Sequence, residues 1–185
     1  MTASIDIVAF SAAELEAHIA TFAALLKACV EDGASIGFVL PFSLAEAESY
    51  WRKKVLPGLG SGGLVLLVAR QGDRIVGTVQ LDHDTFPNQR HRGEVRKLMV
   101  HPKARRRGIA TLLMQAVEKR AAMLGRSLIT LDTRTGDGAE PLYLSLGYRV
   151  AGMIPGYCRD NIAERYDPTT IMYKPLGPHF PGGLA

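Results

Sequence analysis

The stretch Glu94-Val95-Arg96-Lys97-Leu98-Met99-Val100, followed by His101-Pro102-Lys103-Ala104-Arg105-Arg106-Arg107-Gly108-Ile109-Ala110, decides the fold of this 185-residue chain. Its first seven residues indicate a strand, and the rest is a basic turn with one glycine. Apolar residues then recur from Ile109 to Leu124 at the spacing of an amphipathic helix, with Gly125 as its stop. A helix that begins after three arginines and a glycine presents unpaired N–H groups and a positive dipole end. We therefore expect an anion there.

The composition is that of a globular protein, with 47% hydrophobic and 22% charged residues. No window approaches the roughly 20 apolar residues of a membrane helix, so we expect no membrane partner. The first residues, 1–6, lack the basic and apolar regions of a signal peptide, which predicts a cytoplasmic protein. Cys29 and Cys158 lie far apart, one in a helical run and one in an expected loop, and we interpret them as reduced thiols.

The net charge of +4 is unevenly spread. Between residues 90 and 107 a single acid, Glu94, faces eight basic residues: Arg90, Arg92, Arg96, Lys97, Lys103, Arg105, Arg106 and Arg107. Such an excess indicates an anionic partner, either a phosphorylated cofactor or a nucleic acid, unless it is a solvated basic surface. We expect no nucleic acid, because neither a helix-turn-helix nor an RNA-binding aromatic motif accompanies the charge.

Two capping boxes predict the first helices. Ser11-Ala12-Ala13-Glu14 opens a helix to about Asp32, and Ser43-Leu44-Ala45-Glu46 opens another through Trp51 and Val55. Residues 33–41 between them form a glycine-punctuated loop, and residues 57–63 form a glycine-rich break.

Antiparallel strands are expected at residues 64–69 and 74–81, joined by the turn Gln71-Gly72-Asp73. The polar segment 82–93 reads as an exposed loop. Its Asp82-His83-Asp84 run has no second cluster of metal ligands to meet, so no metal site is predicted.

The C-terminal part predicts a strand at residues 128–132, a helix at 139–146, and strands at 148–154 and 169–174 joined by a long loop, 155–168. This element order indicates the α/β class, with a mixed sheet covered by helices. We expect one domain over residues 1–177 and a disordered Pro/Gly-rich tail at 178–185.

Arg105-x-x-Gly108-x-Ala110, placed between a strand and a helix, resembles the acetyl-CoA-binding signature of the GNAT superfamily of N-acetyltransferases. More narrowly, the chain resembles the tabtoxin-resistance acetyltransferase subgroup over about residues 28–177. The matching segments are 33–38, 94–100, 131–133, 155–158 and 168–171. The resemblance implies a mostly antiparallel mixed sheet, splayed between its fourth and fifth strands and flanked by about four helices.

The resemblance also implies a binding mode for acetyl-CoA. The N–H groups of residues 106–111 would cradle its pyrophosphate, arginine side chains would add charge-assisted bonds, and the strand end would hold the pantetheine arm. The implied binding residues are Leu98, Met99, Val100, Arg105, Arg106, Arg107, Gly108, Ile109, Ala110 and Thr111. One departure concerns a family asparagine, whose place is taken here by Gly136.

For catalysis, the resemblance assigns Glu94 and Asp132 as candidate bases, the Val100 N–H as oxyanion donor and Tyr143 as the acid for the leaving thiolate. The plainer alternatives are an ion pair of Glu94 with a neighbouring arginine, a turn cap at Asp132 and a core aromatic at Tyr143. Which carboxylate is the base stays open.

The acceptor is expected to be a primary amine of a small molecule, with Ser35, Phe38, Tyr157 and Cys158 lining its pocket. Two other functions stay open, a non-catalytic acyl-CoA-binding module and an acetyltransferase that acts on a protein amine. The oligomeric state stays open, with a homodimer as one alternative.

Overall fold

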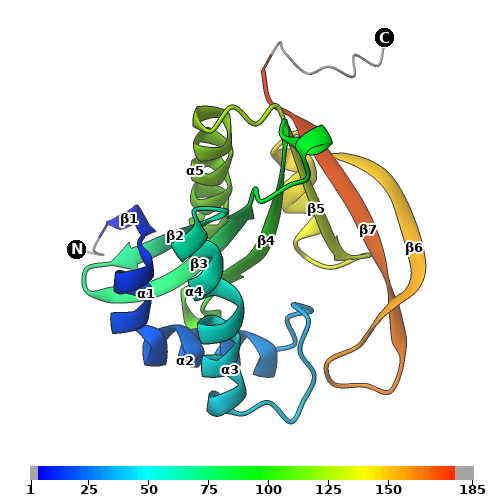
Figure 1. The fold of residues 1–185 in the computed structure, drawn as a ribbon. Coiled ribbons are helices and arrows are strands. Elements are labelled where there is room, and N and C mark those ends of the chain that lie inside the picture. Colours follow the sequence, from blue (N-terminus) through cyan, green and yellow to red (C-terminus); the bar gives the residue numbers. More distant parts are fainter. Residues whose placement is uncertain (1–3, 178–185) are drawn as a thin grey trace.

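The computed structural model describes residues 4–177, which form a single seven-stranded sheet in the order β1-β2-β3-β4-β5-β7-β6 (Figure 1). The strands are β1 (Ile5–Phe10), β2 (Leu64–Gln71), β3 (Arg74–Asp82), β4 (Arg92–Val100), β5 (Leu128–Arg134), β6 (Arg149–Arg159) and β7 (Tyr166–Pro175). The α-helices are α1 (Ala12–Ala17), α2 (Ile19–Glu31), α3 (Leu44–Tyr50), α4 (Leu56–Ser61), α5 (Ile109–Met123) and α6 (Glu140–Ser145). A π-helix, η1 (Trp51–Val55), joins α3 to α4, and short 3-10 turns lie at Pro87–Gln89 and Pro102–Ala104. This confirms the expected α/β class and mixed sheet.

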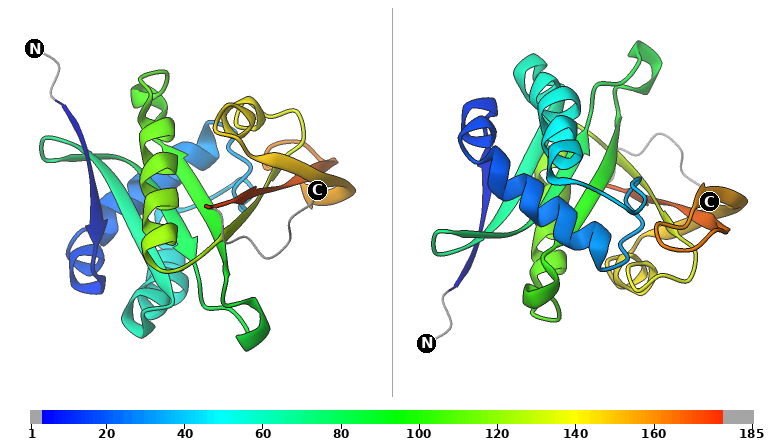
Figure 2. Two further views of the ribbon diagram at one scale, coloured as in Figure 1. Left: turned by 90° about the horizontal axis from the view of Figure 1, so that it is seen from above. Right: turned by 90° about the horizontal axis from the view of Figure 1, so that it is seen from below.

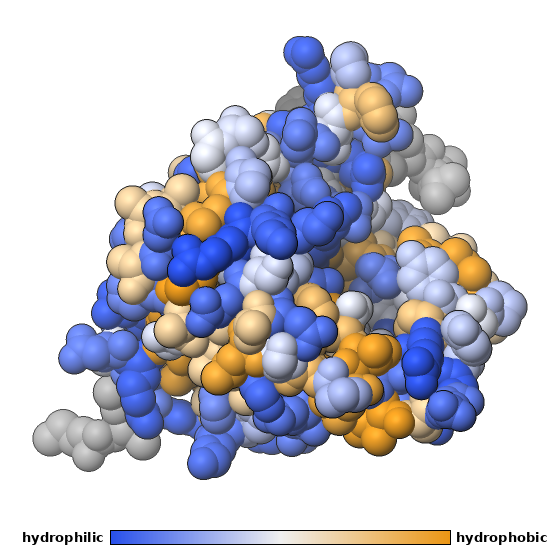
Figure 3. Space-filling model, turned by 60° about the horizontal axis from the view of Figure 1, so that its bottom comes forward, coloured by the Kyte–Doolittle hydropathy of each residue, from blue (hydrophilic) through white to orange (hydrophobic). Residues whose placement is uncertain are grey.

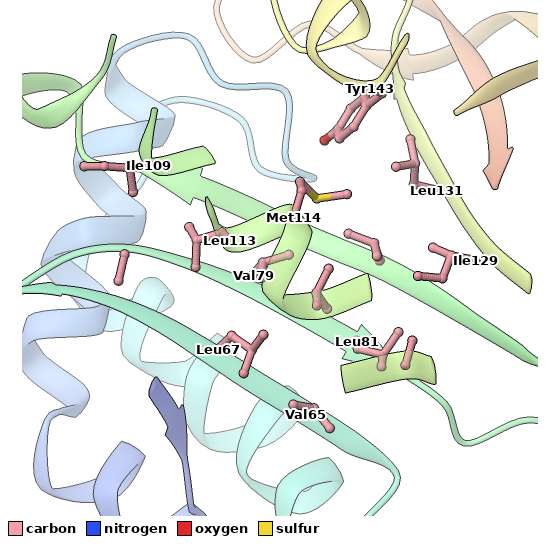
Figure 4. Close-up of a cluster of buried hydrophobic side chains, with 14 of the residues drawn as sticks. Val65, Leu67, Val79, Leu81, Ile109, Leu113, Met114, Ile129, Leu131 and Tyr143 are labelled. Atoms are coloured by element: carbon pink, nitrogen blue, oxygen red, sulfur yellow. The ribbon is translucent and has the colours of Figure 1, made fainter. Parts of the chain in front are cut away.

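Helices cover both faces of the sheet (Figure 2). On one face α5 packs on β2, β3 and β4, where Leu113 and Met114 meet Val79, Leu81 and Ile129 in a continuous core (Figure 4). On the other face α1 to α4 and η1 form a second core around Phe22 and Trp51. Successive residues of a strand point to opposite faces, so the two faces of the sheet present different sets of side chains.

The N-terminal region differs from the expectation in two ways. First, β1 was not predicted, and it pairs antiparallel with β2 at the edge of the sheet. Second, the single helix predicted from Ser11 to Asp32 is broken at His18, whose backbone is non-helical and ends α1 before α2 begins. The His18 ring lies 2.8 Å from the Glu14 carbonyl oxygen, and it packs on Phe10. Both predicted capping boxes are confirmed.

The glycine-rich break predicted for residues 57–63 is wrong, because this segment is mostly the helix α4. Pro57 lies in its first turn, where the proline needs no backbone donor. The helix ends at Gly62, whose φ of 75° is the left-handed conformation that glycine adopts at helix ends.

The long loop predicted for residues 155–168 is also wrong. The chain instead forms an antiparallel hairpin of β6 and β7 that reaches to Arg159 and Tyr166, so Cys158 lies in a strand. Pro155 and Gly156 interrupt the register of the edge strand β6, a place where a sheet tolerates these residues. The tail predicted at residues 178–185 lies outside the described part of the chain.

Two features of β4 prepare the functional site. The parallel pairing of β4 with β5 joins only Arg92–Glu94 to Leu128–Thr130, and within residues 4–177 it does not continue beyond Glu94. The two strands then diverge (Figure 1), which confirms the predicted splay. In addition, β4 has one residue more than β3 between the pairs Thr78–Met99 and Gln80–Arg96. This β-bulge contains Lys97, with a φ of 50°.

Candidate active site

The two predicted bases lie where β4 and β5 separate. Glu94 is the last β4 residue paired with β5, and Asp132 lies two residues beyond its partner Thr130. Their neighbours Val95 and Leu131 point into the core under α5. Glu94 and Asp132 therefore both point to the opposite face of the sheet, which carries α1 to α4.

Glu94 is held by two arginines. Arg96 Nε donates to its carboxylate at 2.8 Å, and Arg92 lies 3.6 Å away, with 29% of the Glu94 side chain exposed. Burial alone would raise the pKa of Glu94, but the hydrogen bond and charge of Arg96, together with Arg92, outweigh it and lower the pKa. Arg96 also binds Asp82 at 2.6 Å. Glu94 is therefore an ionised member of a surface network, which is the plainer alternative that the sequence left open.

Asp132 has a simpler environment than Glu94. It is exposed, and it accepts one hydrogen bond from Thr169 Oγ1 at 3.2 Å. No ion pair involves Asp132 among residues 4–177. Of the two carboxylates, Asp132 is the less compensated.

Lys97 is a site residue that sequence reasoning did not identify as one. Its ammonium lies 5.7 Å from the ring centroid of Phe38 and 5.8 Å from that of Tyr50, as in cation–π contacts. Burial lowers the pKa of Lys97, and the negative charge of Asp132 partly opposes this effect. The sequence placed Lys97 on the same predicted strand as Glu94, one of the two expected bases. The bulge that turns the Lys97 side chain toward α3 could not be predicted from the sequence.

Main-chain groups at the end of β4 face the gap. The N–H of His101 donates to Val76 of β3, whereas the Val100 carbonyl accepts from Arg105 Nε at 3.2 Å, away from β3. Because the N–H and C=O of one strand residue point to the same side, the Val100 N–H also faces the gap. This orientation is the one that an oxyanion donor needs.

The start of α5 offers a further set of free donors. Gly108 caps the helix with a φ of 75° and no side-chain cap, and the first intrahelical bond runs from Leu112 to Gly108. The N–H groups of Ile109, Ala110 and Thr111 thus have no intrahelical partner. Arg106 is also left-handed, at a φ of 61°, and left-handed residues in such a turn help to direct successive N–H groups toward an anion. No described atom lies within 4 Å of the place where a Gly108 Cβ would be.

The three arginines before α5 differ in their contacts. Arg105 binds Asp32 as well as the Val100 carbonyl, and Arg107 donates to Gln71 at 3.3 Å. Arg106 is exposed, and no hydrogen bond or ion pair involves it in the described part of the chain. Arg106 is therefore the arginine with most freedom to reach a phosphate.

Tyr143 lies in the core under α5, with only 6% of its surface exposed. Its ring packs edge-on against Tyr148 at 5.8 Å, and its hydroxyl points toward Met114 of α5 (Figure 4). Burial, then the charges of Asp132 and Asp137, raises the pKa of Tyr143, so its proton is retained at neutral pH. Tyr143 is thus the core aromatic of the plainer interpretation, and it keeps the proton that the predicted acid role requires.

A pocket of about 460 Å³ opens beside β3 and β4, on the same face of the sheet as Glu94 and Asp132, but neither carboxylate is among its lining residues. Residues from the loop after α2, the segment α3–η1–α4, β3 and β4 line it, among them Phe38, Tyr50, Gln80 and Lys97. Figure 3 shows the lower side of the molecule, where a hollow opens near the middle among mostly hydrophilic residues.

The four predicted acceptor-lining residues have different positions. Phe38 lines the pocket, whereas Ser35, Tyr157 and Cys158 are not among its lining residues. Ser35 Oγ lies 3.8 Å from Cys158 Sγ, so the loop after α2 approaches β6 there. Tyr157 on β6 is 52% exposed. Cys29 and Cys158 are both free thiols, and burial raises the pKa of Cys29 to about 11.

Within the described residues, no cluster of three or more potential ligands could hold a metal ion. The helices among those residues are also too short or too polar to cross a bilayer.

Comparison with known proteins identifies the family. A model described as the acetyltransferase (GNAT) family matches residues 40–148 of the chain. The chain belongs to this family. As a GNAT acetyltransferase it is an enzyme and uses acetyl-CoA as acetyl donor, which favours catalysis over a binding module.

Solved structures share the GNAT fold at low identity. A candidate acetyltransferase from Salmonella typhimurium, yncA, with its cofactor acetyl-CoA, is 17% identical, with a TM-score of 0.76 over 98% of this chain and 99% of that one. A ribosomal-protein-alanine N-acetyltransferase from Brucella melitensis is 22% identical (TM-score 0.72; 92% and 99%). A candidate phosphinothricin N-acetyltransferase is 13% identical (TM-score 0.75; 95% and 100%).

The donor side of this GNAT enzyme fits acetyl-CoA. The uncapped start of α5 supplies unpaired N–H groups for a pyrophosphate, and the gap beyond Glu94 leaves main-chain groups of β4 for the pantetheine arm. Where the family often has an asparagine, the Gly136 N–H donates to Glu140 at 2.8 Å, so no side chain reaches out from this position.

Proposed function

We propose that this enzyme transfers the acetyl group of acetyl-CoA to a primary amine of a small molecule, of the amino-acid or amine-toxin type, by direct attack in a ternary complex. One observation carries the proposal. On the sheet face opposite α5, a concave pocket of about 460 Å³ lies beside β3 and β4, and its size is within the range typical of small-ligand sites.

The surroundings of the pocket also support a small acceptor. The loop after α2 is tied to the β6–β7 hairpin by a hydrogen bond from the Leu40 N–H to the Asn161 carbonyl at 2.8 Å. Asn161 Nδ2 in turn donates to Val30 at 2.8 Å, and Arg134 reaches Gly33 at 3.5 Å. These contacts hold in place the loop that contributes Gly37 and Phe38 to the pocket lining.

Acetylation of a protein amine is the second candidate. The Brucella melitensis neighbour is named for a ribosomal protein, and another neighbour is named for the small molecule phosphinothricin. Since both are less than 25% identical to this chain, we rank the candidates on the pocket alone.

The proposed chemistry uses four groups of this chain. When bound, acetyl-CoA supplies a thioester that an amine can attack. An alkylamine with a pKa near ~10 is only about one thousandth unprotonated at neutral pH, so a base has to accept its proton. We assign this role to Asp132, because Glu94 is held by two arginines whereas Asp132 accepts a single hydrogen bond. Glu94 then orients Arg92 and Arg96.

The other two groups act on the donor side. The Val100 N–H faces the gap, where it can donate to a developing oxyanion. Tyr143, which keeps its proton at neutral pH because of its burial, can give that proton to a leaving thiolate.

A thiol-release assay tests the proposal. Acetyl-CoA is supplied with a panel of amino acids and amine antibiotics, and in parallel with peptides that carry free N-termini. We expect release that depends on the small amines and exceeds release with the peptides. Transfer to the peptides alone would replace the small-molecule acceptor with a protein one.

We also propose three general properties of the enzyme. It belongs to the tabtoxin-resistance subgroup, and residues 1–177 form one domain. It is located in the cytoplasm, which the free thiols support.

We further propose a homodimer, since the edge strand β6 is exposed along its length and presents Val150, Met153 and Ile154. Light scattering coupled to size-exclusion chromatography measures the mass directly, and a monomer at micromolar concentration would exclude the dimer.

A further inference from the structure

We propose that the pocket beside the β4 bulge selects acceptors that carry a carboxylate, and that Lys97 and Gln80 bind it. This inference rests on the proposed function and deepens it, because it narrows the acceptor to amines of the amino-acid class. Lys97 supplies a charge and Gln80 supplies a directed N–H donor.

The first observation is an unpaired donor in the wall of the pocket. Gln80 on β3 is only 2% exposed, and its Nε2 has no hydrogen-bond partner. The other end of the same amide is fixed, because Tyr50 donates its hydroxyl to Gln80 Oε1 at 3.2 Å. A buried N–H group without a partner is costly, so a ligand that brings an acceptor oxygen to this place is favoured.

The second observation is an unpaired cation beside that donor. Lys97 lines the same pocket, and no carboxylate within residues 4–177 lies within 4.0 Å of its ammonium. The rings of Phe38 and Tyr50 hold it there instead. Since an aromatic ring leaves the hydrogen-bond donors of an ammonium group unused, Lys97 can still bind an anion.

The charges of the whole lining favour an anion over a cation. Three cations, Lys54, Arg96 and Lys97, face two carboxylates, Asp82 and Asp84. Arg96 already neutralises Asp82 at 2.6 Å, so the charges of the lining that form no ion pair with a described residue are the cations Lys54 and Lys97 and the single carboxylate Asp84, an excess of one positive charge. A polyamine, which has no carboxylate, would be repelled by this excess of positive charge.

The backbone conformation of Lys97 is a further reason to assign a ligand-binding role to its side chain. Its φ of 50° is the left-handed region, where a side chain other than glycine costs about 1 kcal/mol or more. Only the bulge brings the side chains of both Arg96 and Lys97 to the same face, because successive strand residues otherwise alternate.

The experiment compares acceptors that differ only in the carboxylate. L-α-amino acids and their C-terminal amides are assayed with acetyl-CoA for wild type, Lys97→Met and Gln80→Glu. We expect the ratio of kcat/KM, amino acid over amide, to fall about tenfold or more in each variant, the range of a charge-assisted hydrogen bond. The comparison between proteins cancels the intrinsic reactivity of each amine.

Matched controls separate the pocket from general charge. Lys53→Met removes the same charge from the exposed neighbour of Lys54 on η1, outside the pocket lining, and should leave the ratio unchanged. Methionine keeps the length of Lys97 and its contact with the rings, and circular dichroism checks that each variant folds.

The outcomes are distinct. Transfer to amines with a ratio that neither variant changes overturns the carboxylate pocket while the proposed function stands. If no amine in the panel is acetylated, the proposed function fails, and calorimetric titration of the same amino acids into wild type and Lys97→Met decides the pocket. Binding that Lys97→Met weakens supports it, and equal or absent binding overturns it.

Discussion

The two sides of the gap between β4 and β5 are built in different ways. The proposed donor side comes from one continuous segment, residues 100–111, which contributes the Val100 main chain at the gap and the N–H groups of residues 109–111 that have no intrahelical partner. The acceptor side comes from segments distant in sequence, whose side chains meet only in the fold, as Phe38, Tyr50, Gln80 and Lys97 do. A binding surface of main-chain groups tolerates many side chains, whereas a pocket of side chains changes with each substitution. Binding of the acetyl donor can therefore be shared across the family, whereas the choice of acceptor depends on the side chains of this particular protein.

The largest effect should come from the base. Asp132→Asn removes the proton acceptor and should lower kcat by about 100-fold or more, the typical contribution of a general base. Glu94→Gln should cost less, since it mainly releases two arginines. Steady-state kinetics with one acceptor measure both variants. A greater loss in Glu94→Gln would exchange the two roles.

The next largest effect should come from Tyr143, a core residue that we propose as the proton donor to the leaving thiolate. Tyr143→Phe should lower kcat by about 10-fold or more with little change in the affinity for acetyl-CoA, because only a proton donor is lost. Turnover and calorimetric binding of acetyl-CoA are the two measurements. Unchanged turnover would leave Tyr143 as a core aromatic alone.

A smaller effect tests whether the donor side depends on backbone. Gly108→Val forces a β-branched residue into a φ of 75°, at a cost of about 1–2 kcal/mol. The KM for acetyl-CoA should rise about 10-fold, while selectivity among acceptors should stay the same. Arg106→Ala is the matched change to a side chain of the same turn and should have the weaker effect on KM.

The smallest effect concerns the hairpin that closes the acceptor side. The backbone N–H groups of Ala163 and Ile162 lower the pKa of Asp160 from 3.8 to about 2. A lowered pKa in the folded state stabilises the protein above pH 3.8, and this stability is lost as the pH falls toward about 2. Asp160→Asn should lower Tm at pH 7 and flatten the dependence of Tm on pH in that window. A parallel shift of the whole curve would exclude this origin.

The sequence predicted most of the fold where one local signal was sufficient. The capping boxes at Ser11 and Ser43 and the turn at Gly72 gave correct element boundaries. It failed where tertiary pairing overrides local signals. Edge pairing to β2 makes residues 5–10 a strand, and pairing with β7 carries β6 past Pro155 and Gly156.

The candidate site, like the fold, could be predicted from the sequence only where its residues are neighbours along the chain. The turn before α5 was visible because a glycine and basic residues stand next to each other in sequence. The position of Lys97 was not, because it depends on a one-residue difference between two strands. An ion pair of Glu94 with Arg92 or Arg96 was predicted as an alternative, but only the structure shows that Glu94 contacts both arginines at once.

The bulge at Lys97 also bears on the behaviour of the chain in concentrated solution. Beyond Glu94, β4 is an edge strand inside a sheet, and an unpaired edge is a template on which another chain can add a strand and start aggregation. Bulges and lysines are two devices by which natural proteins block such edges. Because β4 has both a bulge and a lysine at residue 97, a strand of a second molecule is hindered from pairing with β4 at the opening where the ligands enter.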